Sequence, residues 1–202
     1  MDYKSTLLMN KSNFEMIPKL ENRKWTVLES QYIAREGDWF TVRREKVSLP
    51  NGFVIPSWYI FEFPNWVNII AITEDNKFVI IDQYRHAIGQ THYELVAGCV
   101  DKTDKTPMEA AKRELLEEAG FGGGEWEEFL VVSPNPTNHN NWSYTFLARN
   151  VKKISQQHAE PSEDIHVHLF SLEELKEMVA QGCFIQALHI APLYKFLYLN
   201  EK

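Results

Sequence analysis

The chain has 202 residues, which is enough for one large domain or for one domain with a small extension. Its 44% hydrophobic and 24% charged residues are typical of a folded globular protein. Asp and Glu outnumber Lys and Arg by 28 to 21, giving a formal net charge of −7. An acidic surface repels a phosphate backbone, so the charge argues against a nucleic-acid partner. The excess carboxylates either form ordinary solvated surface or gather to hold a cation.

The two cysteines, Cys99 and Cys183, are too few for a disulfide framework. The apolar run Leu7 to Met9 is too short for the core of a signal peptide. No other apolar run is long enough to cross a membrane. We therefore expect a cytoplasmic location and no membrane partner.

The first 64 residues predict a small β-rich region. Residues 1–20 show no clear period and are expected to form an N-terminal extension. Short alternating runs follow at 25–28, 39–47 and 53–62, and Asn51-Gly52 between the last two is a strong hairpin signal. Residues 21–64 are therefore expected to form a small antiparallel β subdomain.

Residues 65–202 are expected to form the main domain. The predicted strands cover 67–73, 78–84, 93–96, 127–132, 142–147 and 165–170, and the predicted helices cover 107–119, 172–180 and 188–199. The first two strands are mainly apolar, which predicts burial on both faces. The order of elements predicts an α/β (α+β) fold class, with a mixed sheet and helices on its faces.

The helix predicted over 107–119 has signals at both ends. Thr106 is a natural N-cap, Pro107 takes the first helical position, Glu109 occupies the capping-box position and Gly120 follows the last turn. These signals define its bounds more firmly than those of any other predicted element.

Three glutamates of this helix, Glu114, Glu117 and Glu118, are three and four residues apart and share one face. One interpretation is a solvated acidic face. The other is an all-oxygen site for Mg²⁺ or Mn²⁺, favoured because Arg113 is the single neighbouring cation and because the helix follows a glycine-containing loop after a buried strand.

The segment from Arg113 to Phe121 resembles the REUxEExGU core of the Nudix box at every fixed position. The full family pattern is Gx5Ex7REUxEExGU, and this chain departs from it because the segment from Gly98 is one residue longer. Counted back from Arg113, the first Glu of the pattern falls on Lys105. The resemblance implies a Nudix-type α/β/α sandwich in which Glu114, Glu117, Glu118 and the Ala97 carbonyl hold Mg²⁺, or Mn²⁺.

The resemblance extends to the ADP-ribose and nucleotide-sugar pyrophosphatases of that family. It is carried by Gln83-Tyr84-Arg85, by the run from Tyr93 to Gly98, and by Pro136, sixteen residues beyond Gly120. The subgroup implies a homodimer formed through the small β subdomain. Gln83, Arg85 and Pro136 are candidate substrate-binding residues, although Arg85 is equally compatible with an internal ion pair and Pro136 with a simple turn.

The resemblance also implies a catalytic base on the loop at 158–164, where Glu163 matches best and Glu160 is the alternative. Glu117 would complete the metal cluster and Arg113 would position Glu114. Trp58 is a candidate for stacking on a base, although most tryptophans are core or interface residues. His166 and His168 are more typical of a surface pair than of a metal site, and Gly122 to Gly124 indicate a flexible joint.

The implied reaction is Mg²⁺-dependent hydrolysis of the pyrophosphate bond in a nucleoside diphosphate linked to another moiety, ADP-ribose or a nucleotide sugar, to two monophosphates. One alternative is a Nudix hydrolase acting on dinucleoside polyphosphates or nucleoside triphosphates. Another is a nucleotide-sensing domain that binds without turnover, which the intact glutamates argue against.

Overall fold

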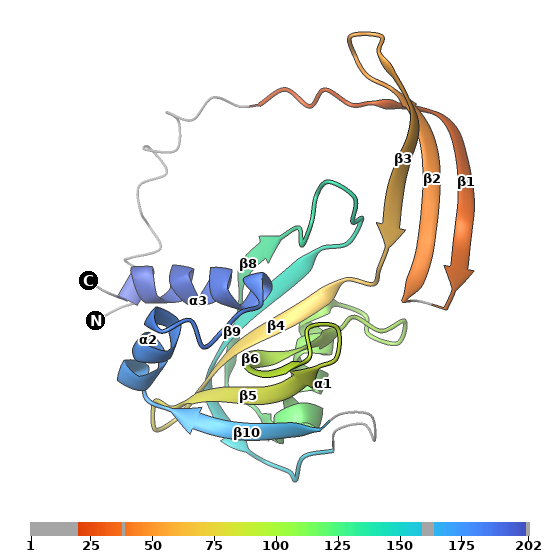
Figure 1. The fold of residues 1–202 in the computed structure, drawn as a ribbon. Helices are drawn as coiled ribbons and strands as arrows, with labels where there is room; N and C mark the ends of the chain where they lie inside the picture. The colour runs from red at the N-terminus through yellow and green to blue at the C-terminus, as the bar shows by residue number, and fades with distance from the viewer. Residues whose placement is uncertain (1–19, 38, 159–163, 201–202) are drawn as a thin grey trace. The chain divides into compact units, whose positions relative to one another are not determined.

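The main sheet of the protein has seven strands and is mixed, as the sequence predicts (Figure 1). A computed structural model describes residues 20–37, 39–158 and 164–200. The strand order is β10-β5-β6-β4-β9-β7, and β8 also pairs with β9. The strands are β4 (Trp66–Thr73), β5 (Phe78–Arg85), β6 (Gln90–Cys99), β7 (Phe121–Gly122), β8 (Glu125–Val132), β9 (Ser143–Lys153) and β10 (Ile165–Phe170). The pairing of β4 with β9 is parallel, whereas the other named pairings are antiparallel.

The two faces of this sheet are covered by different helices. On one face, Ile69 and Ala71 of β4 belong to the apolar cluster that includes α1 (Pro107–Ala119). On the other face, Ile70 and Ile72 join the cluster formed with α2 (Leu172–Ala180) and α3 (Ala187–Asn200). Alternate side chains of a strand point to opposite faces, so an unbroken apolar strand is needed where both faces are covered. The α/β/α arrangement and the two-sided burial of β4 are confirmed.

A second sheet has three antiparallel strands. They are β1 (Thr26–Glu36), β2 (Phe40–Ser48) and β3 (Val54–Glu62), in that order. Asn51 and Gly52 form the turn between β2 and β3, with Gly52 at φ 84° and its N–H donating to Leu49 O. The described residues divide into two compact units, one of residues 20–31 and 44–58 and the other of residues 32–43 and 59–200.

Several strands are longer than predicted, among them β1, β6 and β9, and β7 was not predicted. Strand β1 continues eight residues beyond the predicted end at Leu28, because polar side chains link it to β2: Ser30 donates to Glu45, and Lys46 pairs with Glu29. Strand β7 has only two residues and carries no sequence signal.

The segment Gly122–Gly124, predicted as a flexible joint, connects α1 to strand β8. Gly122 pairs with Lys152 in β7, and the next two residues form the turn into β8. Gly124 has φ 75°, and a Cβ there would lie 2.2 Å from Arg149 O. Glycine is needed at this close approach, so the segment has a defined shape.

None of the helices in the described part of the chain combines the length and the apolar character needed for a membrane crossing.

Candidate active site

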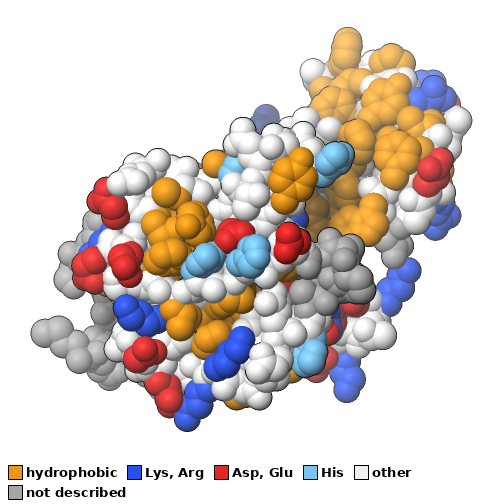
Figure 2. All heavy atoms as spheres, turned by 60° about the horizontal axis from the view of Figure 1, so that its bottom comes forward, with side chains coloured by type: hydrophobic (Ala, Val, Ile, Leu, Met, Phe, Trp, Pro, Cys, Tyr) orange, Lys and Arg blue, Asp and Glu red, His pale blue; other side chains and the backbone are white. Residues whose placement is uncertain are grey.

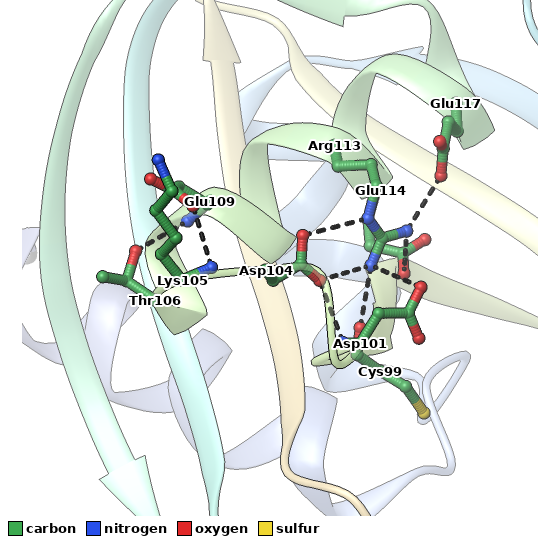
Figure 3. Close-up of polar contacts among 9 residues, drawn as sticks. All are labelled: Cys99, Asp101, Asp104, Lys105, Thr106, Glu109, Arg113, Glu114 and Glu117. Atoms are coloured by element: carbon green, nitrogen blue, oxygen red, sulfur yellow. Dashed lines mark hydrogen bonds and ion pairs between the residues drawn. The ribbon is translucent and has the colours of Figure 1, made fainter.

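Helix α1 begins and ends where its capping residues predict. The Thr106 side chain accepts a hydrogen bond from Glu109 N (3.2 Å), and Pro107 opens the first turn. The Glu109 carboxylate in turn accepts from Lys105 N (2.9 Å) (Figure 3). Gly120 ends the helix in the left-handed conformation, at φ 69°. These caps fix the position at which the three glutamates follow along the helix.

The side chains of Glu114 and Glu118 turn inward from α1 and are buried, whereas that of Glu117 is 44% exposed. The Glu118 carboxylate accepts a hydrogen bond from Ala97 N at the end of β6 (3.1 Å). Buried carboxylates are rare unless they are paired or coordinate a metal. The pattern therefore does not fit a merely solvated acidic face.

Gly98 leaves room for Glu114. A Cβ at residue 98 would lie 2.1 Å from both Cδ and Oε1 of Glu114. Gly98 has no positive φ, so the reason for glycine here is the close approach of the carboxylate rather than the backbone conformation. The loop after β6 and the helix are thus fitted to each other at this residue.

Arg113 ties the carboxylates of α1 to the loop that precedes it. Its Nη1 donates to Glu114 Oε1 and to Glu117 Oε2, both at 2.9 Å, and its Nη2 donates to Cys99 O and Asp104 Oδ2, both at 2.9 Å (Figure 3). Burial alone would lower the pKa of Arg113, but the bonds to Asp104, Glu114 and Glu117 outweigh it and raise that pKa. Arg113 is therefore a permanent cation that orients two of the three glutamates.

Asp104 is a member of this network that sequence analysis missed. The alignment from Arg113 backwards puts Lys105 at the first Glu of the family pattern, but the Lys105 backbone merely donates to Glu109. Counted forward from Gly98, the pattern's Glu falls on Asp104, whose carboxylate bonds Nε and Nη2 of Arg113. The loop therefore keeps its family spacing up to Asp104, and the extra residue falls between Asp104 and Arg113.

One cavity brings together residues from seven separate segments. It is lined by Trp39, Trp66, Val67, Asn68, Gln83, Arg85, Ala97, Gly98, Cys99, Asp101, Arg113, Glu114, Glu117, Glu118, His158, Gln186, Leu188 and His189. Sequence reasoning did not single out the last segment, around Gln186, because its residues form no recognisable motif. His158 was also missed; its N–H donates to Glu117 O (2.8 Å).

Arg85 is both an ion-pair partner and a wall of the cavity. Its Nε and Nη2 bind the two oxygens of the buried Glu94 carboxylate at 2.8 and 2.5 Å. About 40% of the Arg85 side chain stays exposed. The structure therefore shows the internal ion pair at a residue that also borders the cavity, and the substrate-binding role of Arg85 stays a prediction.

Cys99 also borders the cavity, but its thiol is not a nucleophile. Burial, followed by the nearby charges of Glu114 and Asp101, raises the pKa of Cys99 to about 12. A thiol reacts as its thiolate, so Cys99 stays unreactive at neutral pH.

The donor set at the α1 end of the cavity fits a hard divalent cation. Glu114, Glu117, Glu118 and the main chain at Ala97 offer oxygen atoms around one space, which is the ligand chemistry of Mg²⁺ and Mn²⁺. Among the described residues, no three ligand side chains are already clustered as a metal centre. Instead, Arg113 Nη1 bonds Glu114 Oε1 and Glu117 Oε2, both at 2.9 Å, where these carboxylates border the cavity.

Other residues singled out in the sequence lie elsewhere. Pro136 is exposed on the loop between β8 and β9 and is not part of the cavity lining. Trp58 packs edge-to-face on Trp25 within the small unit, with ring centroids 5.2 Å apart. Glu160 and Glu163 lie outside the described residues.

His166 and His168 form a side-chain pair on β10, as predicted. Both bind the Asp82 carboxylate of the neighbouring strand, at 3.2 and 2.6 Å. Burial raises the pKa of Asp82, but the bonds from the two imidazoles outweigh this and keep it below its usual value. The pair therefore fastens β10 to β5.

Comparison with known proteins agrees with this geometry. The model of the NUDIX domain family matches residues 63–188, and the model of the nucleoside diphosphate sugar hydrolase N-terminal domain matches residues 25–61. Two relatives are ADP-ribose pyrophosphatases. The one from Mycobacterium tuberculosis is 26% identical over 156 residues, covering 77% of this chain and 75% of the relative. The one from Bacillus subtilis is 27% identical over 157 residues, covering 75% and 84%.

A third relative, a methanol dehydrogenase activator from Bacillus methanolicus, is 31% identical over 128 residues, covering 63% of this chain and 68% of its own length. A solved structure of an ADP compounds hydrolase shares the fold, with a TM-score of 0.76 at 22% identity, covering 89% of this chain and 96% of the other. The family match, the arrangement of α1 and the relatives lead to one conclusion: this chain belongs to the Nudix family, as a hydrolase of the pyrophosphatase type.

Proposed function

We propose that this enzyme hydrolyses the pyrophosphate bond of a nucleoside diphosphate linked to another moiety, ADP-ribose or a nucleotide sugar, and releases two monophosphates. The observation that carries the proposal is the shared cavity, in which the three glutamates of α1 face the same space as Arg85. The names of the Mycobacterium tuberculosis and Bacillus subtilis relatives support the choice of substrate class. The N-terminal match to a nucleoside diphosphate sugar hydrolase supports it independently.

We propose Mg²⁺ as the cofactor, with Mn²⁺ as a substitute. Glu114, Glu118 and the Ala97 carbonyl would hold it, and Glu117 would complete the set. When bound, the metal neutralises charge on phosphoryl oxygens and lowers the pKa of a coordinated water. A bound cation also reverses the local sign of the charge, which lets an acidic chain accept a polyanionic substrate.

The chain's own residues orient the reactants. Arg113 acts as a positioning residue, because its guanidinium already bonds Glu114 and Glu117. Arg85 is held by Glu94 at the cavity wall, where its exposed part offers donors to a phosphate oxygen. Gln83 lies two residues earlier on the same strand and also lines the cavity. These positions support substrate-binding roles for both residues.

We propose Glu163 as the general base that accepts the proton of the attacking water, with Glu160 as the alternative. Support for the choice comes from the sequence pattern before β10. The variants Glu163→Gln and Glu160→Gln separate the two candidates, because loss of the base lowers kcat while leaving KM for the substrate within a few-fold.

We also propose a cytoplasmic homodimer formed through the small β subdomain of residues 21–64. Large hydrophobic side chains are exposed along the three-stranded sheet, among them Val27, Tyr32, Ile33, Phe53 and Val54 (Figure 2). Such a concentration on a soluble chain is typical of an interface. The free thiols of Cys99 and Cys183 support a reducing compartment.

The test of the activity is a hydrolysis panel with Mg²⁺: ADP-ribose, GDP-mannose, NADH and diadenosine polyphosphates. We expect monophosphate release from ADP-ribose or a sugar nucleotide, lost when EDTA removes the metal. Glu114→Gln should lower kcat at least about 100-fold, since the charged ligand contributes several kcal/mol to the transition state.

The matched control is Glu109→Gln, on the same helix but bonded to Lys105 N outside the cavity. It should retain activity within a few-fold. Hydrolysis of none of the panel, with Glu114→Gln indistinguishable from the wild type, would contradict the proposal.

A further inference from the structure

The end of the cavity lined by the start of α3 is not used by the reaction proposed above. Gln186, which precedes α3, and His189, in its first turn, reach the cavity together with Leu188. His189 is 1% exposed, and both its Nδ1 and the Gln186 Oε1 are buried without a hydrogen-bond partner among the described residues. Buried polar atoms are nearly always satisfied, so two neighbouring exceptions at one cavity wall require an explanation.

This end of the cavity carries no net charge. Burial, with Glu94 opposing and Arg85 adding to it, lowers the pKa of His189 to about 4, so its imidazole is neutral at pH 7. Arg85 is already paired with Glu94 through two hydrogen bonds. A neutral imidazole and a carboxamide suit uncharged groups that both donate and accept hydrogen bonds.

Arg85 relates the position of Gln186 and His189 to that of the proposed reaction. It borders the same cavity as Glu114 and Glu118, and it interacts electrostatically with His189. A phosphate held between the glutamates and Arg85 would therefore carry its esterified group toward Gln186 and His189.

From this arrangement we propose that Gln186 and His189 form a subsite for the hydroxyl groups of a sugar esterified to the substrate's phosphate. The proposal rests on the proposed function for the position of the phosphate. Rotation of the imidazole ring or of the terminal amide turns the unpartnered atom toward the cavity, where a sugar hydroxyl becomes its partner. The sugar is either the nucleoside ribose or the sugar on the other phosphate, and both share this hydroxyl chemistry.

Binding of monophosphates, which requires no turnover, tests the subsite separately from hydrolysis. NMR titrations in the presence of Mg²⁺ give dissociation constants for ribose 5-phosphate, AMP and methyl phosphate, which lacks a sugar. We expect the wild type to bind one of the two sugar phosphates more tightly than methyl phosphate. Preference for AMP identifies the nucleoside ribose, and preference for ribose 5-phosphate identifies the other sugar.

The variants Gln186→Leu and His189→Gln should weaken binding of the preferred sugar phosphate about tenfold each and leave methyl phosphate unchanged. Gln181→Leu, at the exposed C-cap of α2, is the matched control and should change neither. Thermal unfolding of each variant confirms that it is folded; should His189→Gln unfold, Gln186→Leu alone decides.

Three outcomes would overturn the subsite: no preference of the wild type for a sugar phosphate, no effect of the variants, or equal weakening of all three compounds. A protein that hydrolyses nothing in the panel but shows the expected binding would refute the proposed reaction and leave the subsite standing.

Discussion

Gly98 shows how a neighbouring side chain can impose a single residue type on a position. The carboxylate of Glu114 fills the space that any side chain at residue 98 would occupy. The backbone conformation there does not demand glycine, in contrast to the left-handed Gly120 and Gly124. A substitution at Gly98 therefore acts on the candidate metal ligand and not on the backbone.

We predict that Gly98→Ala lowers kcat/KM for the hydrolysed substrate about 100-fold, because a displacement of a reacting group by about 1 Å commonly costs this much. The control is Gly123→Ala, at a left-handed position with no atom within 4 Å of the added Cβ, which strains the backbone without reaching the cavity. Steady-state kinetics of both variants, with circular dichroism to confirm folding, make the comparison. Equal activity of the two would show that Gly98 is not required by Glu114.

The network around Arg113 includes an acidic residue that the sequence motif did not identify. The motif identifies Arg113 and the three glutamates, but it assigns the first acidic position to Lys105. The structure brings Asp104 to Arg113 instead, because the loop between Gly98 and Asp104 folds back against the helix. The sequence pattern alone leaves the acidic position one residue off, and the contact between Asp104 and Arg113 identifies the correct residue.

At the scale of elements, helix bounds are encoded locally and strand bounds are not. Helices α1 and α2 coincide with their predicted ranges, because caps such as Thr106 and Ser171 terminate the hydrogen-bond pattern within the segment itself. Strand β6 extends from Gln90 to Cys99 because Arg85 of β5 pairs with Gln90 and Trp66 of β4 pairs with Cys99. The length of a strand therefore depends on neighbours distant in the sequence.

The start of α3 buries a histidine, which gives the protein a specific pH response. The pKa of His189 falls from 6.5 to about 4 on folding, so the unfolded state binds more protons between these values. The contribution of His189 to the free energy of unfolding is fully present above pH 6.5 and is lost as the pH falls toward about 4. Between pH 7.5 and pH 5, we expect the free energy of unfolding to drop by about 2 kcal/mol through His189.

The measurement is urea denaturation of the wild type and of His189→Gln at the two pH values. All other titratable groups are shared, so their contributions cancel in the difference between the proteins. The variant should lose about 2 kcal/mol less than the wild type over this range. Parallel pH dependences would show that the imidazole is not buried in its neutral form.

At the scale of the whole molecule, the exposed apolar side chains of the three-stranded sheet predict self-association. Light scattering coupled to size exclusion should give about twice the 23.6 kDa of one chain. Replacement of Val27 and Ile33, both about half exposed on β1, by Asp should shift the mass toward that of one chain. A wild-type mass of 23.6 kDa would contradict the proposed dimer.

The matched control for this experiment is Leu169→Asp. Leu169 is exposed to a similar degree but lies on β10 of the large sheet. It should leave the mass unchanged, because its exposed surface is not part of the proposed interface. If Leu169→Asp lowered the mass as much as the β1 variant, the dimer interface would not be specific to the three-stranded sheet.

The sequence by itself determined the helix that carries the three glutamates, the mixed sheet with helices on its faces, and the family to which the chain belongs. These follow from local capping, from strands apolar on both faces and from the nine-position match starting at Arg113. The tertiary structure alone decided that Asp104 anchors Arg113, that Gly98 makes room for Glu114, and that Gln186 and His189 line the same cavity as the glutamates of α1. The physical reason is that a motif records residues adjacent along one chain segment, whereas a cavity is formed by side chains that meet only after the sheet and its covering helices have packed.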